Sequence, residues 1–139
     1  MTYWLVKSER DTWSWDQQVK AGKKGEPWTG VRNAQARNCM RDMKKGDLAF
    51  FYHSGDERRI VGVVKIVREA YQDPTTDDER WVVVDVVAVE PMPKPVTLAD
   101  VKAEPKLAAM VLVKNSRLSV QPVTPAEWRL VAKMGGLKY

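Results

Sequence analysis

Few residues of this chain could do chemistry by their type and spacing. His53 is the only histidine and Cys39 the only cysteine, so an imidazole-rich metal site, a cysteine cluster and an internal disulfide are all excluded. Lys7 and Glu9 stand two residues apart, which places them on one face of a strand as a candidate acid and base. Exposed pairs of this kind are usually inert. The sequence therefore predicts no catalysis, no metal and no cofactor, and keeps the Lys7–Glu9 pair as an alternative.

His53 is followed directly by Ser54, which raises the question of a nucleophile with its base. Neighbours on a strand point to opposite faces, so the two side chains cannot pair unless the strand has already ended. The acidic run of residues 77–79 lies in a hydrophilic loop and is typical of a solvated turn. Neither feature predicts an enzyme.

Binding has more support, and it centres on residues 28–33. Trp28 lies in a Gly- and Lys-rich loop without periodic apolar neighbours, so the sequence does not explain it as an ordinary core residue. The run from Gly30 through Val31 and Arg32 to Asn33 leads into a helix N-terminus, where free N–H groups favour anions or carbonyl oxygens. Asn33 either caps that helix or presents its amide to the edge of a base, and the two roles are compatible.

The charge balance leans mildly toward polyanionic partners. The formal charge is +5 and the sequence pI is about 9.4. Arg37, Arg41 and Lys44 share one helix face, which is either a solvated face or a surface for phosphates. The N-terminus lacks the basic and apolar regions of a signal peptide, and no apolar run approaches the roughly 20 residues of a membrane helix. A soluble, cytoplasmic protein is expected.

The elements that must position these residues begin with a strand over residues 3–7 and a short helix from Ser14 to Gly22. A second helix runs from Asn33 to about Met43, with Gly46 as its left-handed stop. Ala36, Met40 and Met43 form its buried stripe.

Three apolar segments, the last two rich in valine, then predict an antiparallel meander, over residues 47–53, 60–67 and 81–89. Gly62 is the position where the second strand could bend to close a barrel. A short helix starts at residue 97, residues 110–113 read as strand-like, and residues 118–123 form the last strand. Thr124, Pro125 and Glu127 mark a helix start, with Trp128, Val131 and Ala132 as its buried stripe.

Several sequence blocks together resemble the EVE domain, and the match spans almost the whole chain. The blocks are Tyr3-Trp-Leu-Val-Lys-Ser-Glu9, Trp28-Thr-Gly-Val-Arg-Asn33, Gln35-Ala-Arg-Asn38, Met43, Gly46-Asp47, Phe51-Tyr-His-Ser54 and Arg117-Leu-Ser-Val-Gln-Pro-Val123. The resemblance implies an α+β, PUA-like fold, a mixed β pseudo-barrel flanked by short helices, with residues 1–139 as one domain. It also implies a pocket that accepts a base, since the family is linked to modified cytosines in DNA and related readers to modified adenine in RNA.

The resemblance assigns roles to residues of this chain. Trp28 would be the wall on which a base stacks, followed by Val31, Arg32 and Asn33 as a second wall. The opposite side of the pocket would be closed by Tyr52, His53 and Ser54. The rim would be formed by Lys7, Ser8, Arg117, Leu118 and Ser119. Phosphate would be contacted by Arg37, Arg41 and Lys114. Tyr52 and Leu118 could instead be core residues, and Ser119 a barrel residue.

Two positions depart from the family pattern. Arg10 stands where many members have proline, and Ala34 follows Asn33 where an aromatic residue is common. Arg10 adds a charge at the rim, whereas Ala34 removes a ring beside the pocket and puts the family's usual ligand in doubt.

Three functions remain open from the sequence. The leading hypothesis is a monomeric reader that holds a modified base, a modified cytosine first, in nucleic acid without changing it, and that acts through a separate effector protein or by masking its target. The second is a hydrolase of a modified nucleoside that uses Lys7 and Glu9. The third is a small-metabolite or protein-interaction module that uses the same pocket.

Overall fold

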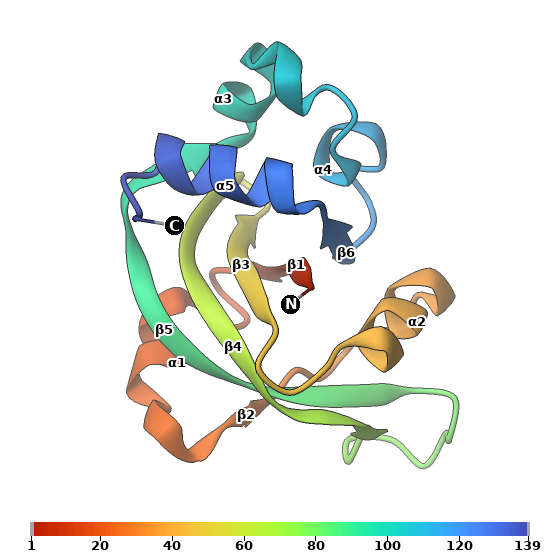
Figure 1. The fold of residues 1–139 in the computed structure, drawn as a ribbon. Helices are drawn as coiled ribbons and strands as arrows, with labels where there is room; N and C mark the ends of the chain where they lie inside the picture. The colour runs from red at the N-terminus through yellow and green to blue at the C-terminus, as the bar shows by residue number, and fades with distance from the viewer. Residues whose placement is uncertain (1, 139) are drawn as a thin grey trace.

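A curved, mixed sheet of six strands forms the centre of the fold in the computed structural model, which describes residues 2–138 (Figure 1). The strands lie in the order β2-β5-β4-β3-β1-β6. Their bounds are β1 Tyr3–Glu9, β2 Glu26–Pro27, β3 Leu48–Ser54, β4 Arg59–Gln72, β5 Val82–Thr97 and β6 Val120–Val123. β1 and β3 are parallel and the other neighbours are antiparallel. The predicted α+β class and the β3–β4–β5 meander are confirmed.

Short helices surround this sheet (Figure 1). They are α1 Trp15–Lys20, α2 Ala34–Asp42, α3 Leu98–Ala103, α4 Val111–Lys114 and α5 Pro125–Met134, with 3-10 turns η1 Gly22–Lys24 and η2 Pro105–Leu107. The side chains of Ser14, Asn33 and Thr124 accept hydrogen bonds from the first turns of α1, α2 and α5, as the sequence predicts. These caps satisfy backbone N–H groups that the helices themselves leave without partners.

The segment 110–113, predicted to be strand-like, is instead a helical turn. The backbone N–H groups of Val113 and Lys114 donate to the carbonyl oxygen of Met110, so the segment satisfies its polar groups locally and needs no neighbouring strand. The turn buries Met110 and Leu112 in the apolar cluster under α5. An apolar run this short fits a buried helical turn as well as a strand, which is why the prediction was wrong.

Several boundaries also differ from the prediction. β4 and β5 extend well beyond the predicted segments, to Gln72 and Thr97, and the last strand begins at Val120. α2 ends at Asp42, because Met43 is already extended. Gly46 does adopt a left-handed conformation, with φ of 97°, but in the turn after the helix.

Two apolar cores lie on the two faces of the sheet, and the alternation along β3 assigns residues to them. Phe50 and Tyr52 belong to the core under α5, where the Trp128 indole stacks on Phe50 with ring centroids 3.9 Å apart. Ala49 and Phe51 belong to the core under α1 and α2. The alternation predicted for residues 48–53 is therefore confirmed, and it places the Phe51 face toward residues 15–31.

Gly62 is required by packing against α1. A Cβ atom at this position would lie 2.4 Å from the Trp15 ring, which is closer than non-bonded carbons approach. The β4–β5 register shifts between Ile60 and Gly62, and the β3–β4 register shifts opposite, between Phe51 and Tyr52. The sheet is thus irregular at the point where the sequence predicts a bend.

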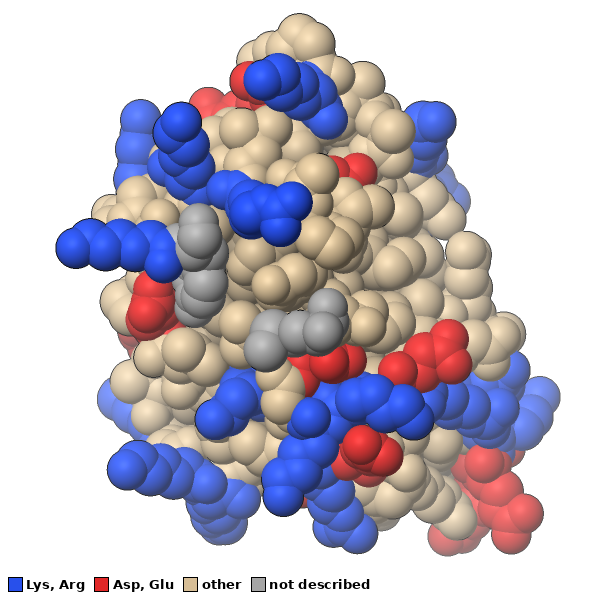
Figure 2. Space-filling model, viewed as in Figure 1, with Lys and Arg blue, Asp and Glu red and all other residues tan. Residues whose placement is uncertain are grey.

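The surface is mixed in charge. Figure 2 shows Lys and Arg interspersed with Asp and Glu over the lower part of this face, where Figure 1 draws α2 and the β4–β5 ends.

Within residues 2–138 no helix has the length and apolar character that crossing a membrane would require.

Candidate functional site

A cavity of about 470 Å³ opens where the parallel strands β1 and β3 end together. Its volume lies within the range of roughly 300–1,000 Å³ that is usual for small-molecule sites. The parallel register places Ser8 beside His53 and Glu9 beside Ser54, so both strand ends reach the same rim. The lining residues are Lys7, Ser8, Glu9, Thr12, Trp13, Glu26, Pro27, Trp28, Thr29, Gly30, Ser54, Ser116, Arg117 and Ser119.

This cavity brings together half of the residues predicted to bind a ligand, namely Lys7, Ser8, Trp28, Ser54, Arg117 and Ser119. A second groove, of about 560 Å³, lies between α1 and the β4–β5 pair. That groove is larger and rich in valine, but it contains none of the predicted residues. We therefore take the cavity at the β1 and β3 ends as the candidate site.

Trp28 forms a fixed wall of the cavity. Its indole packs edge-on against Phe51, with centroids 5.4 Å apart and an interplanar angle of 89°, and its backbone N–H donates to the carbonyl oxygen of Val84 at 2.9 Å. The residue is only 6% exposed. Trp28 thus belongs to the core, in contrast to the expectation from its loop, although it also lines the cavity.

Lys7 connects β1 to the segment that closes the cavity. Its backbone N–H donates to the carbonyl oxygen of Ser119 at 2.9 Å, and its Nζ donates to the carbonyl oxygen of Ser116. The ammonium also lies 5.4 Å from the centre of the Tyr52 ring. Burial lowers the pKa of Lys7. Tyr52 itself is a core residue beneath this lysine and does not line the cavity.

His53 anchors α1 to β3 and does not line the cavity. Its Nε2 accepts the backbone N–H of Trp15 at 3.0 Å, so the ring proton sits on Nδ1, which donates to Glu57 at 3.1 Å. Burial tends to raise the pKa of Glu57, but hydrogen bonds from His53 and Arg59 outweigh it and leave the pKa lowered. The structure thus uses His53 to connect a helix, a strand and a turn.

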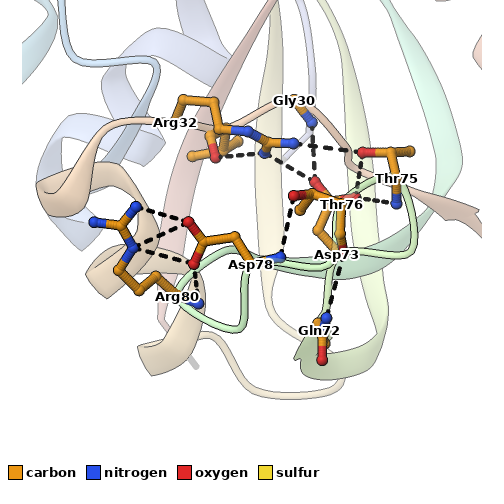
Figure 3. Close-up of polar contacts among 9 residues, drawn as sticks. Gly30, Arg32, Gln72, Asp73, Thr75, Thr76, Asp78 and Arg80 are labelled. Carbon is orange, nitrogen blue, oxygen red and sulfur yellow. Dashed lines mark hydrogen bonds and ion pairs between the residues drawn. The ribbon is translucent and has the colours of Figure 1, made fainter.

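Arg32 is bound to a buried carboxylate behind the cavity wall (Figure 3). Asp73, fully buried at the end of β4, accepts from Arg32 at 3.0 Å and from the backbone N–H of Gly30 at 3.4 Å. It also accepts from the backbone N–H and the hydroxyl of Thr75. Burial tends to raise the pKa of Asp73, yet these hydrogen bonds outweigh it and hold the pKa below its usual value. Asp73 thereby fixes the loop that carries Gly30.

The other predicted residues lie beside the cavity rather than in it. Val31 and Leu118 are buried in the core under α1 and α2. Asn33 accepts the backbone N–H of Ala36 at 2.9 Å, which is the capping role predicted for it. The candidate phosphate contacts Arg37 and Arg41 lie on α2, and Lys114 ends α4; Arg41 and Lys114 are exposed.

Sequence reasoning missed several residues of the cavity. Trp13 lines it with its indole N–H donating to Gln18 at 2.8 Å, and Glu26 enters from β2. The high tryptophan content was the available signal for Trp13. Nothing local marked Glu26, because its place depends on the pairing of β2 with Val86 of β5. Residues 2–138 contain no group of three or more His, Cys, Asp or Glu side chains arranged to hold a metal ion.

The comparisons with known proteins agree with this architecture. Thymocyte nuclear protein 1 of Homo sapiens is 36% identical over 165 residues, covering 96% of this chain and 73% of the relative. A solved structure from Agrobacterium tumefaciens is 54% identical with a TM-score of 0.97, covering 99% of this chain and 94% of the other.

The crystal structure of human THYN1 protein in complex with 5-methylcytosine-containing DNA is 34% identical to this chain. Its TM-score is 0.91, and the match covers 100% of both chains. These matches confirm the PUA-like pseudo-barrel. The EVE domain model matches residues 2–134, and the chain therefore belongs to the EVE domain family.

Proposed function

We propose that this protein reads a modified base in nucleic acid, with 5-methylcytosine in DNA as the first candidate, and releases it unchanged. The observation that carries the proposal is the structural match, over the whole of both chains, to a protein solved with 5-methylcytosine-containing DNA. The cavity at the ends of β1 and β3 supports it, since it combines indole walls with hydroxyl and carboxylate groups. A base needs both an apolar face to pack against and polar partners for its edge.

The cavity offers complementary groups for cytosine. The indoles of Trp13 and Trp28 supply apolar walls. A base that stacks on an aromatic side chain gains about 1–3 kcal/mol. Glu9 and Glu26 add carboxylates, the groups that accept hydrogen bonds from the exocyclic amine of cytosine. The hydroxyls of Ser8, Ser54 and Ser119 can donate to its carbonyl oxygen. In this proposal the apolar walls select the methyl group and the carboxylates select the amine.

The predicted residues that do not line the cavity hold its walls in place. Asp73 fixes Arg32 and the Gly30 wall, Asn33 caps α2, and His53 holds α1 against β3. Val31, Tyr52 and Leu118 form the core beneath. Arg117 at the rim, with Arg37, Arg41 and Lys114 outside the lining, remain the proposed phosphate contacts. The cytoplasmic location, the separate effector and the monomeric state stay predictions.

A hydrolase remains the second candidate, because Lys7 and Glu9 both line the cavity and burial lowers the pKa of Lys7. The hydrogen bond from Lys7 Nζ to the carbonyl oxygen of Ser116 gives this lysine a structural role instead. Incubation with modified nucleosides followed by product analysis separates the two functions. A product that forms in the wild type and not in Lys7→Met would establish the hydrolase.

The experiment for the proposed function is a calorimetric titration with single-stranded oligonucleotides that differ at one central base. We expect 5-methylcytosine to bind about 10-fold more tightly than cytosine, since one methyl group in an apolar pocket contributes about 1–3 kcal/mol. Thymine carries the same methyl group but lacks the exocyclic amine, so it should bind more weakly than 5-methylcytosine. Equal binding of all three oligonucleotides would overturn the proposal.

A further inference from the structure

Three arginines surround one tryptophan beside the candidate site. The guanidinium carbons of Arg32, Arg37 and Arg80 lie 5.7, 5.6 and 5.5 Å from the centre of the Trp81 ring. They come from the loop before α2, from α2 itself and from the turn before β5. Distances below about 6 Å allow cation–π attraction, yet three like charges around one ring also repel one another. The arrangement therefore depends on nearby anions.

Two of the three arginines have a carboxylate partner. Arg32 pairs with Asp73 at 3.0 Å, and Arg80 pairs with Asp78 at 2.7 Å. The hydrogen bond from Arg80 lowers the pKa of Asp78 to about 2, so this carboxylate is fully ionised at neutral pH. Arg37 reaches only the amide oxygen of Asn38, at 3.2 Å, and no carboxylate within residues 2–138 forms an ion pair with it. One positive charge next to Trp81 thus lacks a counter-ion.

Trp81 is connected to the cavity wall through Arg32 and the Asp73 carboxylate. Asp73 accepts from the backbone N–H of Gly30, which lines the cavity, and from Arg32, which contacts Trp81 (Figure 3). Asp77 and Glu79 are exposed in the turn between β4 and β5 that also carries Asp78 and Arg80, so the surface around Trp81 is not basic throughout. An anion would therefore be held on the Arg37 side of Trp81, and by few contacts.

We infer that the nucleic-acid strand leaves the cavity across Trp81 and Arg37. Arg37 binds the phosphate next to the recognised base, and the half-buried Trp81 packs against the neighbouring sugar or base. This inference rests on the proposed function, since it describes the path of the strand whose base enters the cavity. A small number of phosphate contacts, with Arg37 nearest Trp81, also fits the modest net charge of +5.

The test compares a nucleoside with an oligonucleotide. Both 5-methyl-2′-deoxycytidine and a single strand with one central 5-methylcytosine are titrated against the wild type, Arg37→Gln and the control Arg129→Gln. Arg129 is an exposed arginine of α5, so the control makes the same charge change on another element. We expect Arg37→Gln to bind the oligonucleotide about fivefold more weakly at low salt and the nucleoside as tightly as the wild type. The slope of log K against log salt should flatten by about 0.7, the value for one phosphate on a single strand.

The outcomes separate this inference from the proposed function. If the wild type and both variants bind the nucleoside, and Arg37→Gln matches Arg129→Gln on the oligonucleotide, the strand path is overturned and the cavity remains a base site. If the wild type binds neither ligand, both proposals are overturned. Loss of nucleoside binding in Arg37→Gln would also contradict the strand path, because it would place Arg37 in the base pocket.

Discussion

A Trp28→Leu variant is expected to bind the 5-methylcytosine oligonucleotide about 10–100-fold more weakly than the wild type, whereas Trp15→Leu keeps most of the affinity. Both indoles pack edge-on against Phe51 at 5.4 Å, and both belong to the same core. Only Trp28 lines the cavity, where base–aromatic contact contributes about 1–3 kcal/mol. The pair therefore separates loss of a contact with the base from loss of core packing.

The measurement is a binding titration of both variants, with thermal unfolding of each as the folding control. Both replacements remove a buried ring, so we expect each to lower the free energy of unfolding by about 1–3 kcal/mol. Equal loss of binding in the two variants would mean that the cavity responds to general loosening of the core. Unchanged binding in Trp28→Leu would show that the base does not contact this wall.

An Asp73→Asn variant is expected to lose about 2–3 kcal/mol of unfolding free energy and most of its affinity for the base. An amide in place of the carboxylate sets an N–H₂ group against donors from Gly30, Arg32 or Thr75, and an unsatisfied buried donor costs about 1–3 kcal/mol. The pKa of Asp73 lies below its ordinary value, so its stabilising effect is present above pH 3.8 and is lost as the pH falls through the lowered pKa. The difference in unfolding free energy between Asp73→Asn and the wild type should therefore become smaller as the pH is lowered.

The control for this prediction is Asp78→Asn, in the same turn (Figure 3). Asp78 pairs with the exposed Arg80 and makes no contact with Gly30, so its replacement should lower the Tm much less than Asp73→Asn does and leave the affinity for 5-methyl-2′-deoxycytidine unchanged. Thermal unfolding and titration across pH check both variants. If Asp73→Asn unfolds at a lower temperature but binds as tightly as the wild type, the loop that carries Gly30 does not shape the site.

Local signals in the sequence were sufficient for most of the elements. Hydrogen-bonding side chains at Ser14, Asn33 and Thr124 begin their helices as predicted, because a cap depends on residues only three positions apart. The alternation along residues 48–53 assigns each side chain to the correct face for the same reason. The turn at residues 111–114 could not be predicted, since its conformation depends on burial against residues far along the chain.

The site was harder to predict than the elements. Trp28 was recognised as unusual, but its contact with Phe51 brings together residues from distant segments that no periodicity reveals. The sequence marked His53 as the only imidazole, yet its partner is the backbone N–H of Trp15, a group that every non-proline residue has. Arg32 was assigned to the ligand, whereas in the structure it forms an ion pair with Asp73, in the turn between β4 and β5. Polar contacts of this kind join residues that are far apart in the sequence, so they cannot be predicted until the fold is known.

Chemical-shift mapping with 5-methyl-2′-deoxycytidine decides whether the cavity at the ends of β1 and β3 is a base site, because it locates the base on the protein. We expect the backbone amide resonances of Ser8, Gly30 and Ser119, which line the cavity, to shift as the nucleoside is added. Those of Val19 and Val89, which line the second groove and are well exposed, should stay unchanged. Shifts confined to Val19 and Val89, or no saturable shift at Ser8, Gly30 and Ser119, would contradict a base site at the ends of β1 and β3.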